Sequence, residues 1–123
     1  MKMTVKQYLA TNPRQDHRSK YGNIKTEYNG TVFMSKKEAE YAMFLDSARK
    51  AQNASQRVVS YEMQVPYQIT MNDIKICRYL ADFKVFYADG HIEIIDVKGV
   101  RTNIYSLKKK LVKAQYGIKI KEV

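Results

Sequence analysis

The chain has 123 residues, of which 45% are hydrophobic, so it is long enough to form one domain around one core. Its formal net charge of +10 favours a polyanionic partner, and nucleic acid is the usual one. The apolar runs are too short for a membrane span or a signal peptide, and the single cysteine, Cys77, excludes an intramolecular disulfide.

From this composition we expect a cytoplasmic protein without a membrane partner. Residues 1–20 are polar and basic, and we interpret them as a flexible arm that precedes one domain over residues 21–123. The first structural signal inside that domain is Asn29-Gly30, which lies between two short strand-like segments. Asn-Gly favours a type I′ turn, because both central residues need a positive φ. A small hairpin is therefore predicted here.

A helix is predicted over residues 35–52, ending near Asn53, because this segment is rich in Ala, Glu, Lys, Met and Leu, which are good helix formers. Ser35 and Glu38 have the spacing of a capping box, which marks a helix start at Ser35. Tyr41, Leu45 and Ala48 have helical spacing and are expected to face the core.

Three strands are predicted after this helix. In residues 58–69 apolar and polar side chains alternate, and Pro66 favours an edge strand or a locally irregular one because proline cannot donate to a ladder. A turn at residues 71–73 leads to a strand over residues 74–87, and a further strand covers residues 91–98. A second helix follows Gly99, with an expected apolar stripe of Ile104, Leu107 and Leu111, and Gly117 is a typical stop.

A last alternating strand closes the chain at residues 118–123. The order of the elements predicts an α/β or α+β fold, with a mixed β-sheet flanked by helices.

The hairpin between residues 79 and 99 carries the polar residues of interest. A three-residue turn, Ala88-Asp89-Gly90, is a common hairpin connection and pairs Tyr87 with His91. Counting back along both strands places Asp82 opposite Asp96, with Lys98 on the same face. A two-residue turn would instead shift the pairing by one and move Asp82 to the other face.

Two facing carboxylates repel each other unless a positive charge lies between them. A divalent metal ion meets this need, and Mg²⁺ usually takes one or two carboxylates together with waters and phosphates. Lys98 would then orient a water or stabilise phosphate charge. The alternative is an exposed sheet face on which Lys98 simply neutralises both acids.

Asp82, followed by Asp96-Val97-Lys98 on the next strand, resembles the signature of the PD-(D/E)xK nuclease superfamily. More closely, "GTVFMSKKEAEYAMFL", "YLADFKVFYADGHIEIIDVKG" and "YSLKKKLVKAQYGIKIKEV" resemble small phage endonuclease-like proteins related to Holliday-junction resolvases. The resemblance extends from about Tyr21 to the C-terminus and implies a restriction-endonuclease-like fold. Ala81 stands where the superfamily signature has proline, and that proline takes no part in the catalytic chemistry.

The resemblance implies that Asp82 and Asp96 bind Mg²⁺ or Mn²⁺, with the Val97 carbonyl completing the shell, and that Lys98 is catalytic. Glu38, on the helix before the signature, would be a further ligand or would orient water. That role competes with helix capping, and Glu40 is the alternative glutamate. Gln64 is expected beside the site, or else as a solvent-facing strand residue.

These features together predict a metal-dependent DNA endonuclease, with branched or junction DNA as a plausible substrate. The residues expected to bind the DNA backbone are Arg101, Lys108, Lys109, Lys110 and Lys113. A homodimer would suit symmetric cleavage of a junction. The alternatives are a non-catalytic nucleic-acid-binding module that keeps the nuclease fold, and a structural or regulatory protein whose charge only keeps it soluble.

Overall fold

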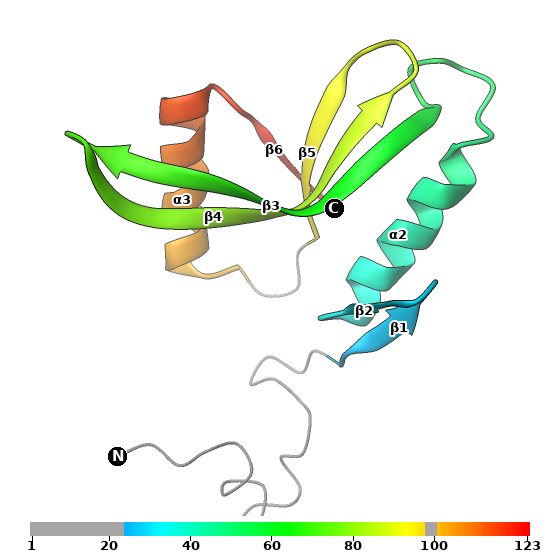
Figure 1. Ribbon diagram of the computed structural model, residues 1–123, viewed down its shortest axis with the longest axis horizontal. Helices are drawn as coiled ribbons and strands as arrows, with labels where there is room; N and C mark the ends of the chain where they lie inside the picture. The colour runs from blue at the N-terminus through cyan, green and yellow to red at the C-terminus, as the bar shows by residue number, and fades with distance from the viewer. Residues whose placement is uncertain (1–23, 98–100) are drawn as a thin grey trace, which may run out of the picture.

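The computed structural model describes residues 24–97 and 101–123. A two-stranded antiparallel sheet, β1 (Thr26–Tyr28) and β2 (Thr31–Phe33), precedes helix α2 (Lys36–Ala48) (Figure 1). A four-stranded sheet follows, in the order β3 (Val58–Met71), β4 (Ile74–Tyr87), β5 (Ile92–Asp96) and β6 (Ile120–Glu122). Helix α3 (Asn103–Tyr116) connects β5 to β6. The expected N-terminal arm, residues 1–20, lies outside the described residues.

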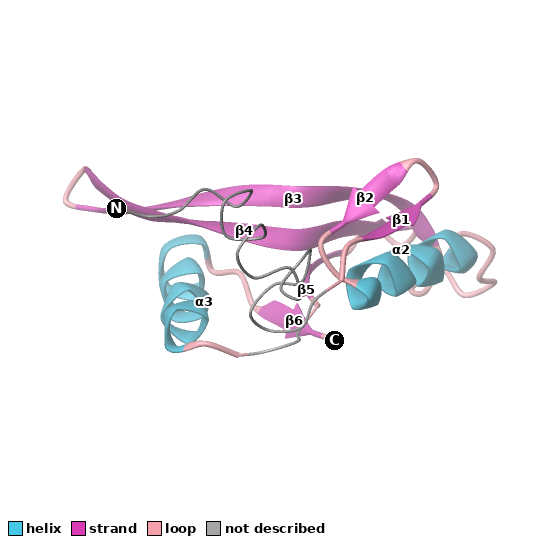
Figure 2. Cartoon of the chain, turned by 90° about the horizontal axis from the view of Figure 1, so that it is seen from below, coloured by secondary structure: helices cyan, strands magenta, loops and turns pink. Residues whose placement is uncertain are grey.

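The four-stranded sheet is mixed, because β6 is parallel to β5 while the other neighbours are antiparallel. Together with the two helices this confirms the predicted α+β class. The long β3–β4 hairpin extends over both helices, and β5 and β6 lie between α2 and α3 (Figure 2). Strand β3 is at the edge of the sheet, as Pro66 predicted. Within the described ranges, no helix is long and apolar enough to cross a membrane.

Local sequence signals fix the first hairpin turn and the start of α2. Asn29 and Gly30 have positive φ angles of 52° and 80°, and they connect the pair Tyr28↔Thr31. The Ser35 hydroxyl accepts a hydrogen bond from the Glu38 N–H at 3.1 Å, which confirms the predicted helix start. The hairpin and the helix start are thus set by residues close in sequence.

The expected end of α2 is wrong. The helix ends at Ala48 rather than continuing to residue 52. The Arg57 guanidinium donates hydrogen bonds to the carbonyls of Ala51 and Gln52, and that of Arg49 donates to the Val59 carbonyl. These contacts hold the chain after Ala48 in turns, which helix propensity alone does not reveal.

Two hydrophobic clusters lie along the hairpin. The first joins α2 to the sheet and comprises Phe33, Ala39, Ala42, Leu45, Val58, Phe83, Val85 and Ile95. The second joins α3 to the sheet and comprises Ile69, Tyr79, Ala81, Ile94, Val112 and Ile120. Of the residues expected to face the core from α2, Leu45 is buried, and Tyr41 and Ala48 pack against the cluster partly buried.

The expected apolar stripe of α3 is wrong at two of its three positions. Ile104 and Leu107 are 68% and 56% exposed, whereas Val112 is buried and Leu111 is half-buried. The helix therefore packs through a face rotated from the predicted one. Its end is as predicted, since Gly117 has a φ of 71° and its N–H donates to the Lys113 carbonyl.

Candidate functional site

The hairpin register brings the two aspartates of the predicted site together. The β4–β5 pairs extend from Phe86↔Ile92 to Phe83↔Ile95, so the next step places Asp82 opposite Asp96. The turn has the predicted geometry, with Gly90 at a φ of 95°. The Val97 N–H, on the strand end beside Asp96, donates to Asp82 Oδ2 at 2.8 Å. The predicted three-residue connection and its register are confirmed.

The Asp82 carboxyl lies in an environment that disfavours its charge. Burial is the main cause, the Asp96 carboxylate adds repulsion, and the Glu38 carboxylate adds a smaller contribution. The hydrogen bond from the Val97 N–H acts in the opposite direction. The net effect raises the pKa of Asp82 to about 7. A cation next to this carboxyl would therefore relieve an unfavourable interaction that the folded chain contains.

Asp96 is buried, with 6% of its surface exposed. The Tyr79 hydroxyl donates a 2.6 Å hydrogen bond to Asp96 Oδ2, so this oxygen is held in place by a neighbour on β4. Burial and this bond raise the pKa of Tyr79 well above its usual range, so the phenol stays a donor. Tyr79 was not predicted as a site residue. Its contact with Asp96 joins positions 17 residues apart in the chain, so no local sequence pattern reveals it.

Gln64 lies opposite Asp82 on the other side of β4. The β3–β4 pairs Met63↔Phe83 and Val65↔Ala81 flank this position. Gln64 has a φ of 53°, in the left-handed region that residues other than glycine rarely adopt. Such strained positions are concentrated at functional sites. The prediction that Gln64 neighbours Asp82 is thus consistent with the register.

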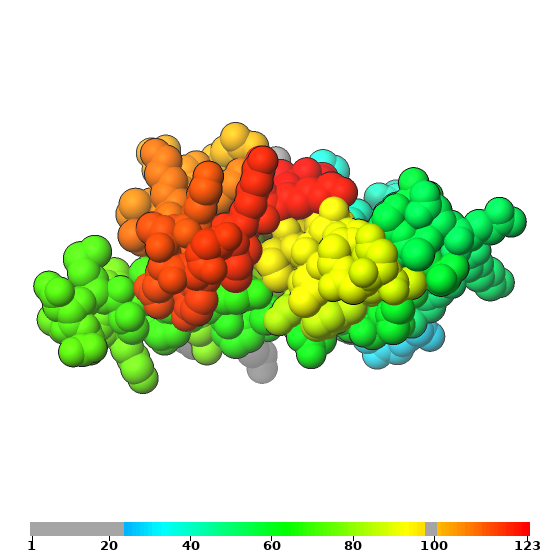
Figure 3. Space-filling view, turned by 90° about the horizontal axis from the view of Figure 1, so that it is seen from above, coloured from blue at the N-terminus to red at the C-terminus, as the bar shows by residue number. Residues whose placement is uncertain are grey.

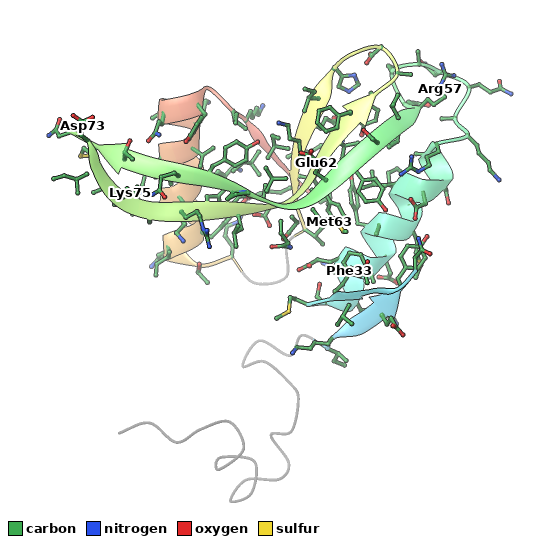
Figure 4. All side chains as sticks on the ribbon, viewed as in Figure 1. Phe33, Arg57, Glu62, Met63, Asp73 and Lys75 are labelled. Carbon is green, nitrogen blue, oxygen red and sulfur yellow. The ribbon has the colours of Figure 1, made fainter. Side chains whose placement is uncertain are left out.

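A cleft of about 140 Å³ connects these elements. It is lined by Glu38, Gln64 and Asp82, together with Met63 and Phe33, which Figure 4 labels on the hairpin and on β2. Glu38 therefore both begins α2 through its backbone N–H and borders the cleft with its side chain. The exposed Glu40 instead lines a separate hollow with Lys37, Tyr41, Phe44, Val97 and Val123. The structure thus favours Glu38 over Glu40.

A second hollow, of about 310 Å³, lies on the other side of Asp82 and includes Asp96. Arg78, from β4, and Lys108, from α3, supply its positive charge, and the Lys108 Nζ donates to the Arg78 carbonyl at 3.0 Å. Arg78 was missed by the sequence reasoning. It precedes Asp82 by four residues on a strand, so the two-residue period would have placed both on one face.

The remaining basic residues form a different group. Arg101, Lys109, Lys110 and Lys113 line a hollow of about 330 Å³ with Glu122. Lys109 Nζ lies 3.2 Å from Glu122 Oε2, and Arg101 forms an ion pair with the same carboxylate. Of the basic residues that were predicted and are described, Lys108 is thus the one that borders the two aspartates.

The described part of the site fits a hard divalent cation in donor type, and its two carboxylates are as many as Mg²⁺ commonly uses. Asp82 and Asp96 supply the carboxylate oxygens that Mg²⁺ prefers, and Mg²⁺ commonly uses only one or two carboxylates. Within residues 24–97 and 101–123, no group of three or more His, Cys, Asp or Glu residues could hold a metal ion. Lys98 lies outside the described residues, so its predicted position next to the acids stays a prediction.

Comparison with known proteins places the chain in one family. No curated protein and no solved structure matches it. A family model described as "Protein of unknown function (DUF1064)" matches residues 18–122, which includes every described element. The match begins within the basic N-terminal segment and ends one residue before the C-terminus. The chain therefore belongs to the DUF1064 family.

Proposed function

We propose that this protein is a metal-dependent DNA endonuclease with its active site at Asp82 and Asp96. The observation that carries the proposal is the pairing of these two acids on adjacent strands. Burial, with added repulsion from Asp96, raises the pKa of Asp82 to about 7. Two carboxylates that face each other do not stabilise a fold by themselves, because their charges repel. A divalent cation bound between them would offset this repulsion, and two carboxylates are a common ligand set for Mg²⁺.

Mg²⁺ or Mn²⁺, when bound, would supply Lewis-acid activation of a phosphate and of a water. The roles of the chain itself follow from the geometry. Asp82 and Asp96 would hold the cation, with Tyr79 fixing one Asp96 oxygen and the Val97 N–H fixing one Asp82 oxygen. Gln64 and Glu38, which share the cleft with Asp82, would position water.

Lys98 follows Asp96 by two positions and would orient the attacking water or stabilise charge on the phosphate. Lys108 and Arg78 would contact the DNA backbone beside the two aspartates, because both border the hollow that contains them. The group of Arg101, Lys109, Lys110 and Lys113 would contact the backbone farther along. None of these contacts reads base sequence.

A non-catalytic DNA-binding module is the second candidate. The observation that favours it is the lack of a third metal-binding side chain among the described residues. The net charge of +10 supports DNA binding in both cases. The two candidates differ in what happens to the phosphodiester bond.

One experiment separates them. Four-way junctions, flaps, nicked duplexes and linear duplexes are incubated with the purified protein in Mg²⁺, Mn²⁺ or EDTA, and products are resolved by denaturing electrophoresis. An endonuclease cuts at least one of these DNAs in Mg²⁺ or Mn²⁺ and none in EDTA. Binding to DNA without cleavage of any substrate would favour the binding module.

A further inference from the structure

The β3–β4 hairpin is much longer than the sheet that it belongs to. Each strand has 14 residues, whereas β5 pairs with β4 only between Phe83 and Phe86. The far end of the hairpin projects past α3 in the ribbon view and in the space-filling view (Figures 1 and 3). Figure 4 labels Asp73 and Lys75 at this end. We call residues 66–80 the hairpin arm.

One side of the hairpin arm is covered and the other is open. Ile69 and Tyr79 are buried against α3. The end of the arm exposes three aliphatic side chains, Met71, Ile74 and Ile76, which are 57%, 63% and 54% exposed. Isolated two-stranded ribbons are only marginally stable in water. A group of exposed apolar side chains on such a ribbon often marks an interaction site.

The open side of the hairpin arm leads directly to the candidate active site. Arg78, Leu80 and Asp82 are two residues apart on one strand and share one face, and all three border the hollow that contains Asp96. The Lys108 Nζ is bonded to the β4 edge at the Arg78 carbonyl. A DNA strand with one phosphate at Asp82 could therefore follow this face of β4 past Leu80 and Arg78 towards the end of the hairpin arm.

We propose that the hairpin arm is a DNA-contacting surface that lies along a duplex segment on one side of the phosphate bound near Asp82. This inference rests on the proposed function for the identity of the ligand. Lys75, Arg78 and Lys108 would contact phosphates, and the aliphatic end would contact the groove. A two-stranded ribbon fits the major groove, where apolar side chains can contact the methyl group of thymine.

The charge of the surface favours DNA over a second copy of the chain. The basic residues Lys75 and Arg78 lie among the exposed aliphatic ones, and the arm has one acidic residue, Asp73. Two copies packed face to face would bring like charges together, which costs stability at each contact. A polyanion instead gains from the same residues.

The length of the arm sets the expected footprint. Eight residue steps separate Ile74 from Asp82, which corresponds to about 26 Å at ~3.3 Å per residue. That distance equals roughly eight base-pair steps at ~3.4 Å each. We therefore expect the protein to need about eight base pairs of duplex on one side of its target for full affinity.

The test measures binding of fluorescein-labelled four-way junctions with arms of 6, 8, 10, 12 or 14 base pairs, in Ca²⁺ and over a series of salt concentrations. For the parent, affinity should rise with arm length and level off near eight to ten base pairs. The double variant Lys75→Gln/Arg78→Gln should lower the salt slope by about 1.8, since each lost phosphate contact removes about 0.9. Ile74→Ser/Ile76→Ser should weaken binding about fivefold and leave the slope unchanged.

Matched controls are Lys50→Gln, an exposed lysine after α2, and Val59→Ser, an exposed aliphatic residue at the other end of the same hairpin. Both should bind like the parent. Circular dichroism and urea unfolding confirm that each variant folds.

The inference would be overturned if both arm variants bound DNA with the same affinity, salt slope and dependence on arm length as the parent. It would also be overturned if sedimentation showed a parental dimer that Ile74→Ser/Ile76→Ser dissociates without loss of DNA binding, because a second copy would then occupy the arm. If the parent binds DNA with the expected length dependence but cleaves none, the nuclease proposal fails and this inference stands. If the parent binds no DNA, both fail.

Discussion

Replacement of Asp82 by Asn should make the metal-free protein more stable at neutral pH, although Asp82 is a proposed active-site residue. The reason is the pKa of its carboxyl, which burial, Asp96 and Glu38 raise from 3.8 to about 7. The change removes the negative charge that these neighbours disfavour. Asn keeps an oxygen that can accept the hydrogen bond from the Val97 N–H.

The magnitude follows from linkage between protonation and folding. Near pH 5 to 6 the folded protein holds a proton on Asp82 that the unfolded chain has released, so stability falls as pH rises from about 4 to about 7. Each pKa unit corresponds to about 1.36 kcal/mol, so a shift of about three units corresponds to at most about 4 kcal/mol. Because Asp82 is only half-buried, we expect roughly 2–3 kcal/mol at pH 8.

Urea unfolding between pH 4 and pH 8 in EDTA measures this difference. Parent and Asp82→Asn should have similar free energies of unfolding at pH 4, and the variant should be more stable at pH 8. Addition of 10 mM Mg²⁺ should then stabilise the parent by roughly 1.4 kcal/mol, for a dissociation constant of about 1 mM, and should not stabilise the variant.

Asp73→Asn is the matched control, since it removes an exposed acid at the end of the hairpin and changes the net charge equally. It should leave the pH dependence unchanged. An Asp82→Asn protein that is less stable than the parent at pH 8, or that keeps the parental slope between pH 4 and pH 7, would refute the reasoning.

Three further predictions concern cleavage, binding and stability. Asp96→Asn and Lys98→Ala should each reduce cleavage of the best DNA substrate by roughly 10²–10³ and leave DNA binding in Ca²⁺ largely intact, and equal cleavage by parent and variants would assign the activity elsewhere. Replacement of Lys108, Lys109 and Lys110 by Ala should weaken DNA binding and flatten its salt dependence, and unchanged binding at every salt concentration would exclude α3 as a contact. Asp46→Asn should lower the free energy of unfolding by about 1 kcal/mol at pH 7, because Asp46 accepts hydrogen bonds from Tyr28 and Tyr61 and bonds with Arg49. These bonds lower the pKa of Asp46, so this contribution should be lost as pH falls below about 4, and pH-independent destabilisation would contradict it.

The parts of the fold that were predicted from sequence depend on residues close together in the chain. Gly90 fixes the turn, the turn fixes the β4–β5 register, and the register places Asp82 opposite Asp96. Ser35 likewise fixes the start of α2. In each case a few neighbouring residues decide the geometry, so the pattern is sufficient.

The parts that were not predicted depend on distant contacts. Helix α3 has apolar residues on more than one face, and the sheet decides that Val112 rather than Ile104 is buried. The end of α2 is a different case, because it depends on side-chain hydrogen bonds from Arg49 and Arg57 to backbone carbonyls five to ten residues away, which helix propensity does not reveal. The left-handed conformation of Gln64 has no signal in the sequence, because Gln is neither a turn former nor a usual residue there.

The position of Asp82 explains why the candidate site lies at this point of the fold. On one side of it, Phe83 belongs to the cluster under α2, and on the other side Ala81 belongs to the cluster under α3. Strand β5 pairs with β4 as far as Phe83, so the β4 edge beyond Asp82 is no longer covered by that strand. A carboxylate placed where a sheet opens between two cores is partly desolvated by both, yet it remains accessible along the open edge. Burial raises the pKa of Asp82, and the hollow that Asp82 and Asp96 line leaves space for a ligand next to the carboxyl.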